Sequence, residues 1–390
     1  MFLNHCRLYA AFTGGFASED GCVEIKNGKI ASVGSARPDT DSDCFDCSGK
    51  TLLPGLIDLH THITMLGNVG VSSAGDPMQL VVEAAEQAKR YLHYGFTTIR
   101  DCGSIGRSAN YVKKLIAKDV IAGPDILACG NVLMPGIIDR ADPLGGINNY
   151  CDGAEAYRKG VRSEVAKRSD FIKIYASGSA FMPTGVPTHP IMTFDEIRTA
   201  VETAQANGLY VAAHCHADSA ILDCIHAGVR TIEHATYITS KTTDVLLSTP
   251  DACLVPTFAA MYVSQTEPNE RAFWLERLTP MLESCAQTIE YAYRAGATIG
   301  FGTDSAPLSK QYEHGVEFRY RKEYCHMENL DIILQATKIN ARIAGLSDTV
   351  GEIKPGLKGD LILVDGNPAE DLSAMYVPPA RVWKNGNLCF

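Results

Sequence analysis

The middle of the chain alternates short apolar runs with segments of helix length, and this alternation constrains the fold more than any other feature. Strands separated by helices indicate repeated β-α units and a parallel sheet, hence an α/β protein. Eight such strands fit a TIM-like (β/α)8 barrel, whose active site lies at the carboxyl ends of the strands. The expected strands are 56–60, 97–101, 125–128, 171–175, 210–214, 231–234, 253–257 and 298–302, and the clearest helices are 77–94, 193–207 and 331–344.

Both ends of the chain are rich in expected strands instead. Residues 23–25 and 30–33 flank Asn27-Gly28, which is a favoured two-residue hairpin turn. Residues 360–364 and 380–383 have the same character. We therefore expect residues 1–54 and 356–390 to pair into one composite β-sandwich domain, while residues 55–355 form the barrel.

The composition narrows the class of protein. A net charge of −10 over 390 residues argues against nucleic acid or an anionic membrane surface as the main partner. The chain has no apolar run of about 18 residues, so no membrane-spanning helix is predicted. Residues 1–7 lack the pattern of a secretory signal, and the 13 scattered cysteines then indicate reduced thiols in a cytoplasmic protein. Cys44 and Cys47 form a lone pair, which favours a loop thiol pair over a zinc knuckle.

Histidine or aspartate stands where four of the expected strands end. His60 and His62 are two residues apart, so on a strand they face the same way and can aim two imidazoles at one point. Nitrogen and oxygen donors converging from distant segments are what a divalent metal site needs. The full set of donors is His60, His62, His214, His216, His234 and Asp304.

Lys173 is the only charged residue in the apolar run 171–175. Many strand lysines reach the surface with their ammonium group. Here Ile172 and Ile174 would face the helices, so Lys173 would point into the barrel. Burial there favours the neutral amine, which can react with carbon dioxide. The resulting carbamate can bridge two metal ions.

Plainer interpretations exist for several of these donors. The His60–His62 pair could be two polar residues at a strand end, and His234 could be a packed core histidine. Asp304 could cap the following helix, or as a ligand it could act as general base. Because the expected strand ends near His214, His216 is better placed to contact the substrate and take part in catalysis.

Together these residues resemble the metal-site signature of the amidohydrolase superfamily. Within this superfamily, the chain most resembles the branch of Xaa-Pro dipeptidases (prolidases) and imidazolonepropionase-like proteins. The matching phrases are residues 53–62, 172–178, 231–234 and 302–304, with a similar return strand at 353–361. The resemblance implies a barrel with a terminal β-sandwich and a site for two divalent ions, usually zinc. The implied ligands are His60, His62 and Asp304 for the more buried ion, His214 and His234 for the more exposed ion, and carboxylated Lys173 as the bridge.

Two turns depart from the resemblance. Family dipeptidases tend to carry His-Ala-Tyr after strand five, where this chain has His214-Cys215-His216. They also tend to place Gly-Gly-His after strand three, where residues 134–140 contain no histidine. The metal ligands are kept, but groups expected at the substrate are replaced. The candidate substrate contacts are His216, Tyr237 and Arg140.

We therefore expect a metal-dependent hydrolase that cleaves an amide C–N bond of a small molecule. A dipeptide or N-acyl amino acid is the leading substrate, and Asp304 would carry the proton to the leaving nitrogen. The alternative substrate is a cyclic amide, a carbamate or a urea-like compound at the same site. A non-catalytic scaffold should have lost ligands, yet all six expected positions are filled. We also expect a homo-oligomer.

Overall fold

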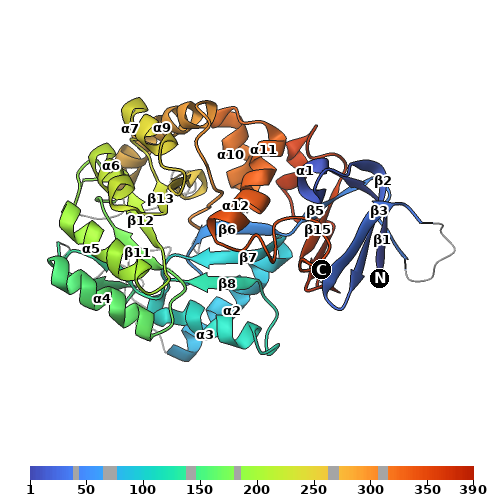
Figure 1. Ribbon diagram of the computed structural model, residues 1–390, viewed down its shortest axis with the longest axis horizontal. Helices are drawn as coiled ribbons and strands as arrows, with labels where there is room; N and C mark the ends of the chain where they lie inside the picture. Colours follow the sequence, from blue (N-terminus) through green and yellow to red (C-terminus); the bar gives the residue numbers. More distant parts are fainter. Residues whose placement is uncertain (38–43, 65–76, 138–145, 180–185, 262–271, 306–314) are drawn as a thin grey trace.

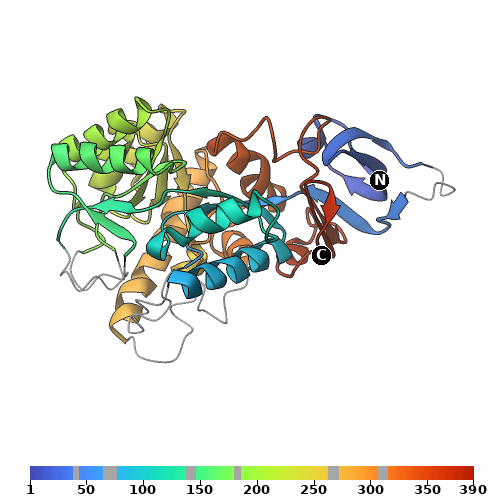
Figure 2. The same ribbon diagram turned by 90° about the horizontal axis from the view of Figure 1, so that it is seen from below.

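The structure is a computed structural model that describes residues 1–37, 44–64, 77–137, 146–179, 186–261, 272–305 and 315–390. Two parts lie side by side in both views (Figures 1 and 2). One part holds parallel strands with helices outside them, and the other is a sheet on which both termini lie. The predicted α/β class with parallel sheets is confirmed.

An eight-stranded sheet joins the two ends of the chain, in the order β17-β16-β15-β5-β1-β2-β3 with β4 paired to β1. The predicted hairpin is β2 and β3, which pair antiparallel around Asn27 and Gly28 with φ values of 52° and 75°. β15 pairs antiparallel with both β5 and β16. The strands are β1 (Phe2–Leu8), β2 (Ser18–Lys26), β3 (Lys29–Ser35), β4 (Cys44–Asp46), β5 (Lys50–Pro54), β15 (Leu361–Asp365), β16 (Arg381–Lys384) and β17 (Asn387–Leu388).

The central part contains a six-stranded sheet, β10-β9-β11-β12-β13-β14, and a three-stranded sheet, β6-β7-β8. The strand pairs within both sheets are parallel. Seven of the eight strands expected here are present, and the short β9 and β10 were not expected. The bounds are β6 (Leu56–Thr61), β7 (Phe96–Asp101), β8 (Asp125–Ala128), β9 (Val132–Met134), β10 (Asn148–Tyr150), β11 (Ile172–Tyr175), β12 (Val211–Cys215), β13 (Thr231–His234) and β14 (Cys253–Val255).

The eighth expected strand, 298–302, does not form a regular strand but still lies between β14 and β6. Gly300 N donates to Leu254 O at 2.8 Å, and Leu59 N donates to Phe301 O at 3.0 Å. A Cβ atom on Gly302 would lie 2.6 Å from Val255 Cγ1 and 2.9 Å from the Cβ of His60. Glycine therefore permits a close backbone approach that a side chain would prevent.

Helices cover the outside of the parallel strands (Figure 1). Every residue of β6, β7, β12 and β13 is buried, as expected for parallel strands covered on both faces. The predicted helix 331–344 is interrupted by a π-helical turn, η2. The bounds are α1 (Ala10–Thr13), α2 (Pro77–His93), η1 (Ile105–Arg107), α3 (Ser108–Ile116), α4 (Ala154–Ala166), α5 (Phe194–Gln205), α6 (Asp218–Ala227), α7 (Ser240–Leu247), α9 (Ala272–Arg294), α10 (Gly315–Cys325), α11 (Asn329–Leu334), η2 (Gln335–Ile339), α12 (Asn340–Ile343) and η3 (Leu372–Met375).

A partly buried ion cluster links the terminal sheet to the central part; Lys384 and Asp360 are buried, whereas the side chain of Asp125 is 41% exposed. Lys384 Nζ on β16 lies 2.5 Å from Asp360 Oδ2 and 2.9 Å from Asp125 Oδ2, at the start of β8. Lys358 Nζ approaches the same Asp125 oxygen at 2.6 Å. Within the part of the chain that the structure describes, no helix has both the length and the apolarity to cross a bilayer.

Candidate metal centre

The donors predicted from the sequence lie at the carboxyl ends of the parallel strands. Strand register places His214 beside Tyr175 of β11, and His234 beside Cys215 of β12. Each of these side chains belongs to a residue that is at most 5% exposed: His60, His62, Lys173, His214, His216 and His234. Donors that are far apart in the sequence therefore share one buried region.

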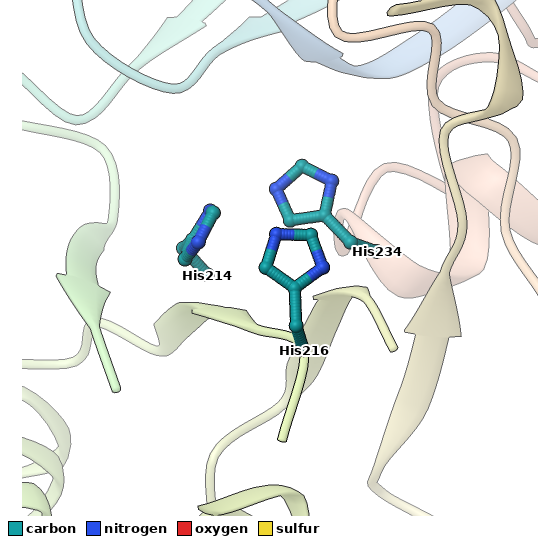
Figure 3. Close-up of side chains that lie close together, drawn as sticks. All are labelled: His214, His216 and His234. Carbon is teal, nitrogen blue, oxygen red and sulfur yellow. The ribbon is translucent and has the colours of Figure 1, made fainter. Parts of the chain in front are cut away.

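The histidines and Asp304 form two neighbouring groups. The first, here called the inner group, is His60, His62 and Asp304. The second, here called the outer group, is His214, His216 and His234 (Figure 3). Within each group the candidate ligand atoms all lie within 4.8 Å of one another. The two groups adjoin, because the ring centroids of His60 and His234 are 4.9 Å apart.

Asp304 completes the inner group. Its Oδ1 lies 3.1 Å from His62 Nε2 and 3.4 Å from His60 Nε2. Its backbone N donates to His60 O at 2.7 Å, which fixes Asp304 beside β6. Asp304 has a φ of 56°, a left-handed conformation that is uncommon for a non-glycine residue and often occurs at functional sites. The two imidazoles and the carboxylate therefore converge, and the backbone hydrogen bond between Asp304 and His60 fixes their relative positions.

The second ring nitrogen of each inner histidine has a partner. His60 Nδ1 lies 2.7 Å from Glu233 Oε2, and His62 Nδ1 lies 2.6 Å from Gly103 O. Metal-binding histidines commonly donate their other ring N–H to a carboxylate or a carbonyl, which fixes the tautomer. Both histidines therefore keep Nε2 available on the side of Asp304.

The outer group has the same kind of support. His216 Nδ1 lies 2.7 Å from Thr236 Oγ1, and His234 Nδ1 lies 2.7 Å from Thr257 Oγ1. His214 Nε2 lies 3.3 Å from Gly178 O. The resulting arrangement turns one nitrogen of each ring towards the other two rings (Figure 3).

Lys173 brings an amine to this region. The residue is 1% exposed on β11, and its Nζ has no hydrogen-bond partner among the described residues. Its charge affects both groups, because after burial it is a further cause that lowers the pKa of His60 and of His214. An unpartnered buried amine is energetically unfavourable. A group that is added to this nitrogen, or that binds it, would remove the penalty.

Burial keeps most of the imidazoles neutral. It lowers the pKa of His60 to about 4 and that of His216 to about 3, and the pKa values of His214 and His234 lie well below their usual range for the same reason. For His62, burial acts in the same direction, but the contact with Asp304 prevails and raises the pKa. Neutral imidazole is the form that binds metal ions.

Glu233 is a functional residue that the sequence reasoning missed. Its Oε1 lies 2.7 Å from Arg100 Nη2 and accepts from Thr231 Oγ1 at 2.5 Å, while Oε2 faces His60. Arg100 holds the pKa of Glu233 far below its usual range, despite burial that acts in the opposite direction. Cys102 lies close enough to form a third candidate group with His60 and Glu233, but burial raises the pKa of its thiol to about 12. Glu233, rather than Cys102, is therefore the partner that orients the His60 ring, through its contact with Nδ1.

Asp58 connects β6 to the segment that carries Asp304. It accepts from the backbone N of His60 at 2.9 Å, from Thr303 N at 3.1 Å and from Thr303 Oγ1 at 2.5 Å. Burial raises the pKa of Asp58 to about 7. A single carboxyl group thereby fixes the backbones that present His60 and Asp304.

An ion pair on α10 holds the loop that supports His234. Glu317 Oε2 accepts from Phe258 N and Ala259 N, each at 2.8 Å. Arg321, which pairs with Glu317 at 2.8 Å, donates to Pro256 O at 2.8 Å and to Gly300 O at 3.0 Å. The pair thus fixes the backbone on both sides of Thr257, the partner of His234.

The structure does not bring every predicted residue to the centre. Tyr237 lines an open pocket of about 290 Å³, and none of the donor histidines lines that pocket. Arg140 lies outside the described residues. Cys47 Sγ donates to Phe45 O at 3.6 Å, and among the residues described no candidate metal group includes Cys44 or Cys47.

Comparison with known proteins agrees with the fold. Residues 51–389 match the amidohydrolase family. Ochratoxinase of Aspergillus niger is 26% identical over an alignment of 371 positions, which covers 86% of this chain and 75% of that protein. Imidazolonepropionase of Sphingopyxis alaskensis is 23% identical over an alignment of 391 positions, which covers 90% of this chain and 88% of that protein. A solved structure of a Xaa-Pro dipeptidase with bound methionine in the active site superimposes with a TM-score of 0.89 at 26% identity, covering 100% of this chain and 99% of the other.

The chain belongs to the amidohydrolase family, and the resemblance inferred from its motifs is confirmed. It is an enzyme, a hydrolase that acts on amide bonds. Members of this family generally bind divalent metal ions. The donors present here fit such ions, because they are neutral imidazoles and a carboxylate.

Proposed function

We propose that this enzyme uses two divalent metal ions to cleave an amide C–N bond in a dipeptide or an N-acyl amino acid. The observation that carries the proposal is the juxtaposition of two three-donor groups with the buried, unpartnered amine of Lys173. One group alone would support a single ion. Two adjoining groups and a nitrogen that can become a bridging carbamate support a pair.

The proposed ligands follow the two groups. His60, His62 and Asp304 would hold the inner ion, His214 and His234 would hold the outer ion, and carboxylated Lys173 would bridge both. Zinc is the proposed metal, since imidazole and carboxylate suit it. When bound, such ions make water a stronger acid and polarise a carbonyl group.

Asp304 is the residue best placed to move a proton. Its side chain is 17% exposed, whereas those of His60 and His62 are 2% and 4% exposed. His60 and His62 outweigh the effect of burial and hold the pKa of Asp304 below its usual range, so the carboxylate is ionised near neutral pH. The carboxylate would accept a proton as the nucleophile forms and return it to the leaving nitrogen.

The substrate class has a second candidate. The segment 134–140 has no histidine, and the strand-five motif is His-Cys-His, so groups that would contact a dipeptide are replaced. A cyclic amide, a carbamate or a urea-like compound would suit the same centre. The relative named imidazolonepropionase keeps this alternative open. A non-catalytic scaffold is disfavoured because the donors are present and buried.

The finer architecture is part of the proposal. We propose that β6, β7, β8, β11, β12, β13, β14 and segment 298–302 form a closed eight-stranded (β/α)8 barrel. The backbone bonds of segment 298–302 to β14 and β6 support closure on that side. Residues 55–355 would be the barrel, and residues 1–54 with 356–390 a β-sandwich domain. Tyr237 and Arg140 as substrate contacts, the cytoplasmic location and the homo-oligomeric state stay predictions.

A substrate panel tests the proposed reaction. The protein is produced with Zn²⁺ and bicarbonate and assayed on Xaa-Pro, Xaa-hydrophobic and Xaa-basic dipeptides, N-acetyl amino acids, cyclic amides, carbamates and phenylureas. Cleavage of dipeptides or N-acyl amino acids is expected. Cleavage of the other compounds alone would favour the alternative substrate class. Protein that binds two ions yet cleaves none of the panel would contradict the proposal.

A further inference from the structure

His216 lies among the outer donors, although the family resemblance gives the outer ion only His214 and His234. We propose that His216 is a third imidazole ligand of that ion rather than a direct contact for the substrate. The inference rests on the proposed two-ion centre. It deepens that proposal by assigning the outer ion three ring nitrogens.

The local backbone explains why His216 reaches the centre. β12 continues through Cys215, one residue beyond the predicted end of the strand. Residues two apart on a strand face the same way, so His214 and His216 repeat the arrangement of His60 and His62. The backbone of His216 is also held, since its N donates to Ser177 Oγ at 2.8 Å and its O accepts from Tyr237 N at 3.0 Å.

The three outer rings are equivalent in burial and spacing. His216 and His234 are each 5% exposed and His214 is 4% exposed. The ring centroid of His216 lies 4.6 Å from that of His214 and 4.8 Å from that of His234. Nitrogens bound to one zinc ion in a tetrahedral site are about 3.4 Å apart. A small inward shift from the present separation, within 4.8 Å, would bring the three nitrogens to that spacing.

Both nitrogens of His216 are already assigned by this arrangement. Nδ1 lies 2.7 Å from Thr236 Oγ1, which matches the 2.7 Å contact of His234 Nδ1 with Thr257 Oγ1. When each Nδ1 donates to its threonine, Nε2 keeps a lone pair for a metal ion. In Figure 3 the ring of His216 turns this other nitrogen towards the space that His214 and His234 also face. No ring nitrogen is left for a substrate.

Three imidazoles also predict which ions the outer position prefers. Imidazole suits Zn²⁺ and other late first-row ions, whereas Mg²⁺ and Ca²⁺ prefer oxygen. An outer site with three ring nitrogens should therefore select Zn²⁺ or Co²⁺ more strongly than a site with two. Replacement of His216 by tyrosine, the residue typical of the dipeptidases at this position, should weaken that preference.

Metal titration of the purified full-length chain tests the assignment. Metal-free protein is titrated with Zn²⁺ and with Co²⁺ in bicarbonate buffer, by calorimetry and by the visible absorption of Co²⁺. His216→Tyr and His216→Asn should weaken the second, outer ion about 100-fold or more, exceeding the loss from a supporting residue. The affinity for the inner ion should stay unchanged. The visible spectrum of Co²⁺ at the outer position should change in the way expected for one nitrogen ligand fewer. Tyr237→Phe is the control, because Tyr237 follows β13, which ends at the outer donor His234, yet its side chain lines a separate pocket. The metal titration of this variant should equal that of the wild type.

A second variant keeps the test informative if the His216 variants do not fold. Thr236→Val removes the partner of His216 Nδ1 and should weaken the outer ion about 10–100-fold. Wild-type affinities and an unchanged Co²⁺ spectrum in these variants would overturn the inference and return His216 to the substrate. Wild-type protein that binds fewer than two ions would instead overturn the two-ion centre, and this inference with it.

Discussion

Glu233 Oε2 lies 2.7 Å from His60 Nδ1, and the other oxygen of the same carboxylate lies 2.7 Å from Arg100 Nη2. The side chains of Glu233 and Arg100 are fully buried, so neither charge is solvated by water. The carboxylate fixes the tautomer of His60 and leaves its Nε2 facing Asp304, where the proposed inner ion would bind. The guanidinium in turn keeps the carboxylate charged.

Glu233→Gln should therefore affect both stability and metal binding. Loss of the carboxylate leaves Arg100 buried without a charged partner, which should lower the free energy of unfolding by about 3–5 kcal/mol. The affinity for the inner ion should fall about 10–100-fold. Urea unfolding of metal-free protein and zinc titration measure the two effects. Asp360→Asn breaks another buried pair, with Lys384, and should lower stability without changing metal affinity. Equal losses of metal affinity in both variants would remove the positioning role from Glu233.

Glu317→Gln tests the support of the outer ion from α10. The amide oxygen can still accept from Phe258 N and Ala259 N, but the charge is lost and the amide NH2 would then face Arg321 in place of the oxygen that pairs with it. Thr257 should then hold His234 less firmly, and the outer ion should bind about 10-fold more weakly while the inner ion is unaffected. Calorimetric titration separates the two ions. If the affinities for the inner and the outer ion fall equally, the pair of Glu317 and Arg321 acts only on the overall stability of the protein.

Lys173→Met tests the carbamate. Wild-type protein in ¹³C-bicarbonate with zinc should show a carbamate carbon resonance, since the amine is buried and unpartnered. The variant should lack this resonance, bind one ion instead of two, and lose turnover by orders of magnitude. Methionine has a similar length and no charge, so the fold should be retained, as circular dichroism can verify. A variant with full turnover would exclude Lys173 from the centre.

Asp304→Asn should lower kcat by orders of magnitude while leaving the fold intact. The amide keeps the shape and one oxygen, but it cannot accept and return a proton. Activity on the best substrate of the panel, corrected for bound zinc measured on the same sample, separates proton transfer from metal loss. Near-normal turnover at full metal content would remove Asp304 from the proton-transfer step.

His216 makes the stability of the metal-free protein depend on pH. Burial lowers the pKa of His216 from its ordinary value of 6.5 to about 3 in the folded state. Between these values the unfolded state binds the extra proton, so the contribution of His216 to stability is complete above pH 6.5 and is lost as the pH falls towards 3. Wild type should lose up to about 1.4 kcal/mol per pH unit relative to His216→Asn over this range. Denaturant unfolding of both proteins at pH 7, 6 and 5 measures the free energy of unfolding. If this free energy changed equally with pH in the two proteins, the prediction would be contradicted.

Part of the centre could be predicted because strands impose a simple rule on side chains. His60 and His62 were assigned together since residues two apart share a face, and Lys173 was assigned to the interior since Ile172 and Ile174 face outward. His216 was predicted to contact the substrate because the strand was expected to end near His214. β12 includes Cys215, so the same rule applies to a second pair.

Other residues could not be found by that rule. Glu233 was given no role. Neighbouring residues of a regular strand face opposite sides, but His234 has a φ of 69° and departs from strand geometry, so both side chains reach the centre. Thr236 and Thr257 lie in loops, where no periodicity tells which way a hydroxyl points. Segment 298–302 was expected as a strand from its apolar residues, but its two glycines permit a close approach without regular pairing.

A single residue, Gly55, separates β5 from β6, the strand that carries His60. β5 is paired along its length with β15. Thr51 Oγ1 also donates to the backbone O of Gly366, just beyond β15, at 2.6 Å, although the two residues are 315 positions apart. During synthesis, His60 and His62 therefore emerge long before the segment that completes the neighbouring sheet. Loop closure over such a distance is slow relative to local pairing. The entrance to the first ligand strand becomes fixed only when nearly all of the chain has been made, so capture of the inner ion should be among the last events of folding.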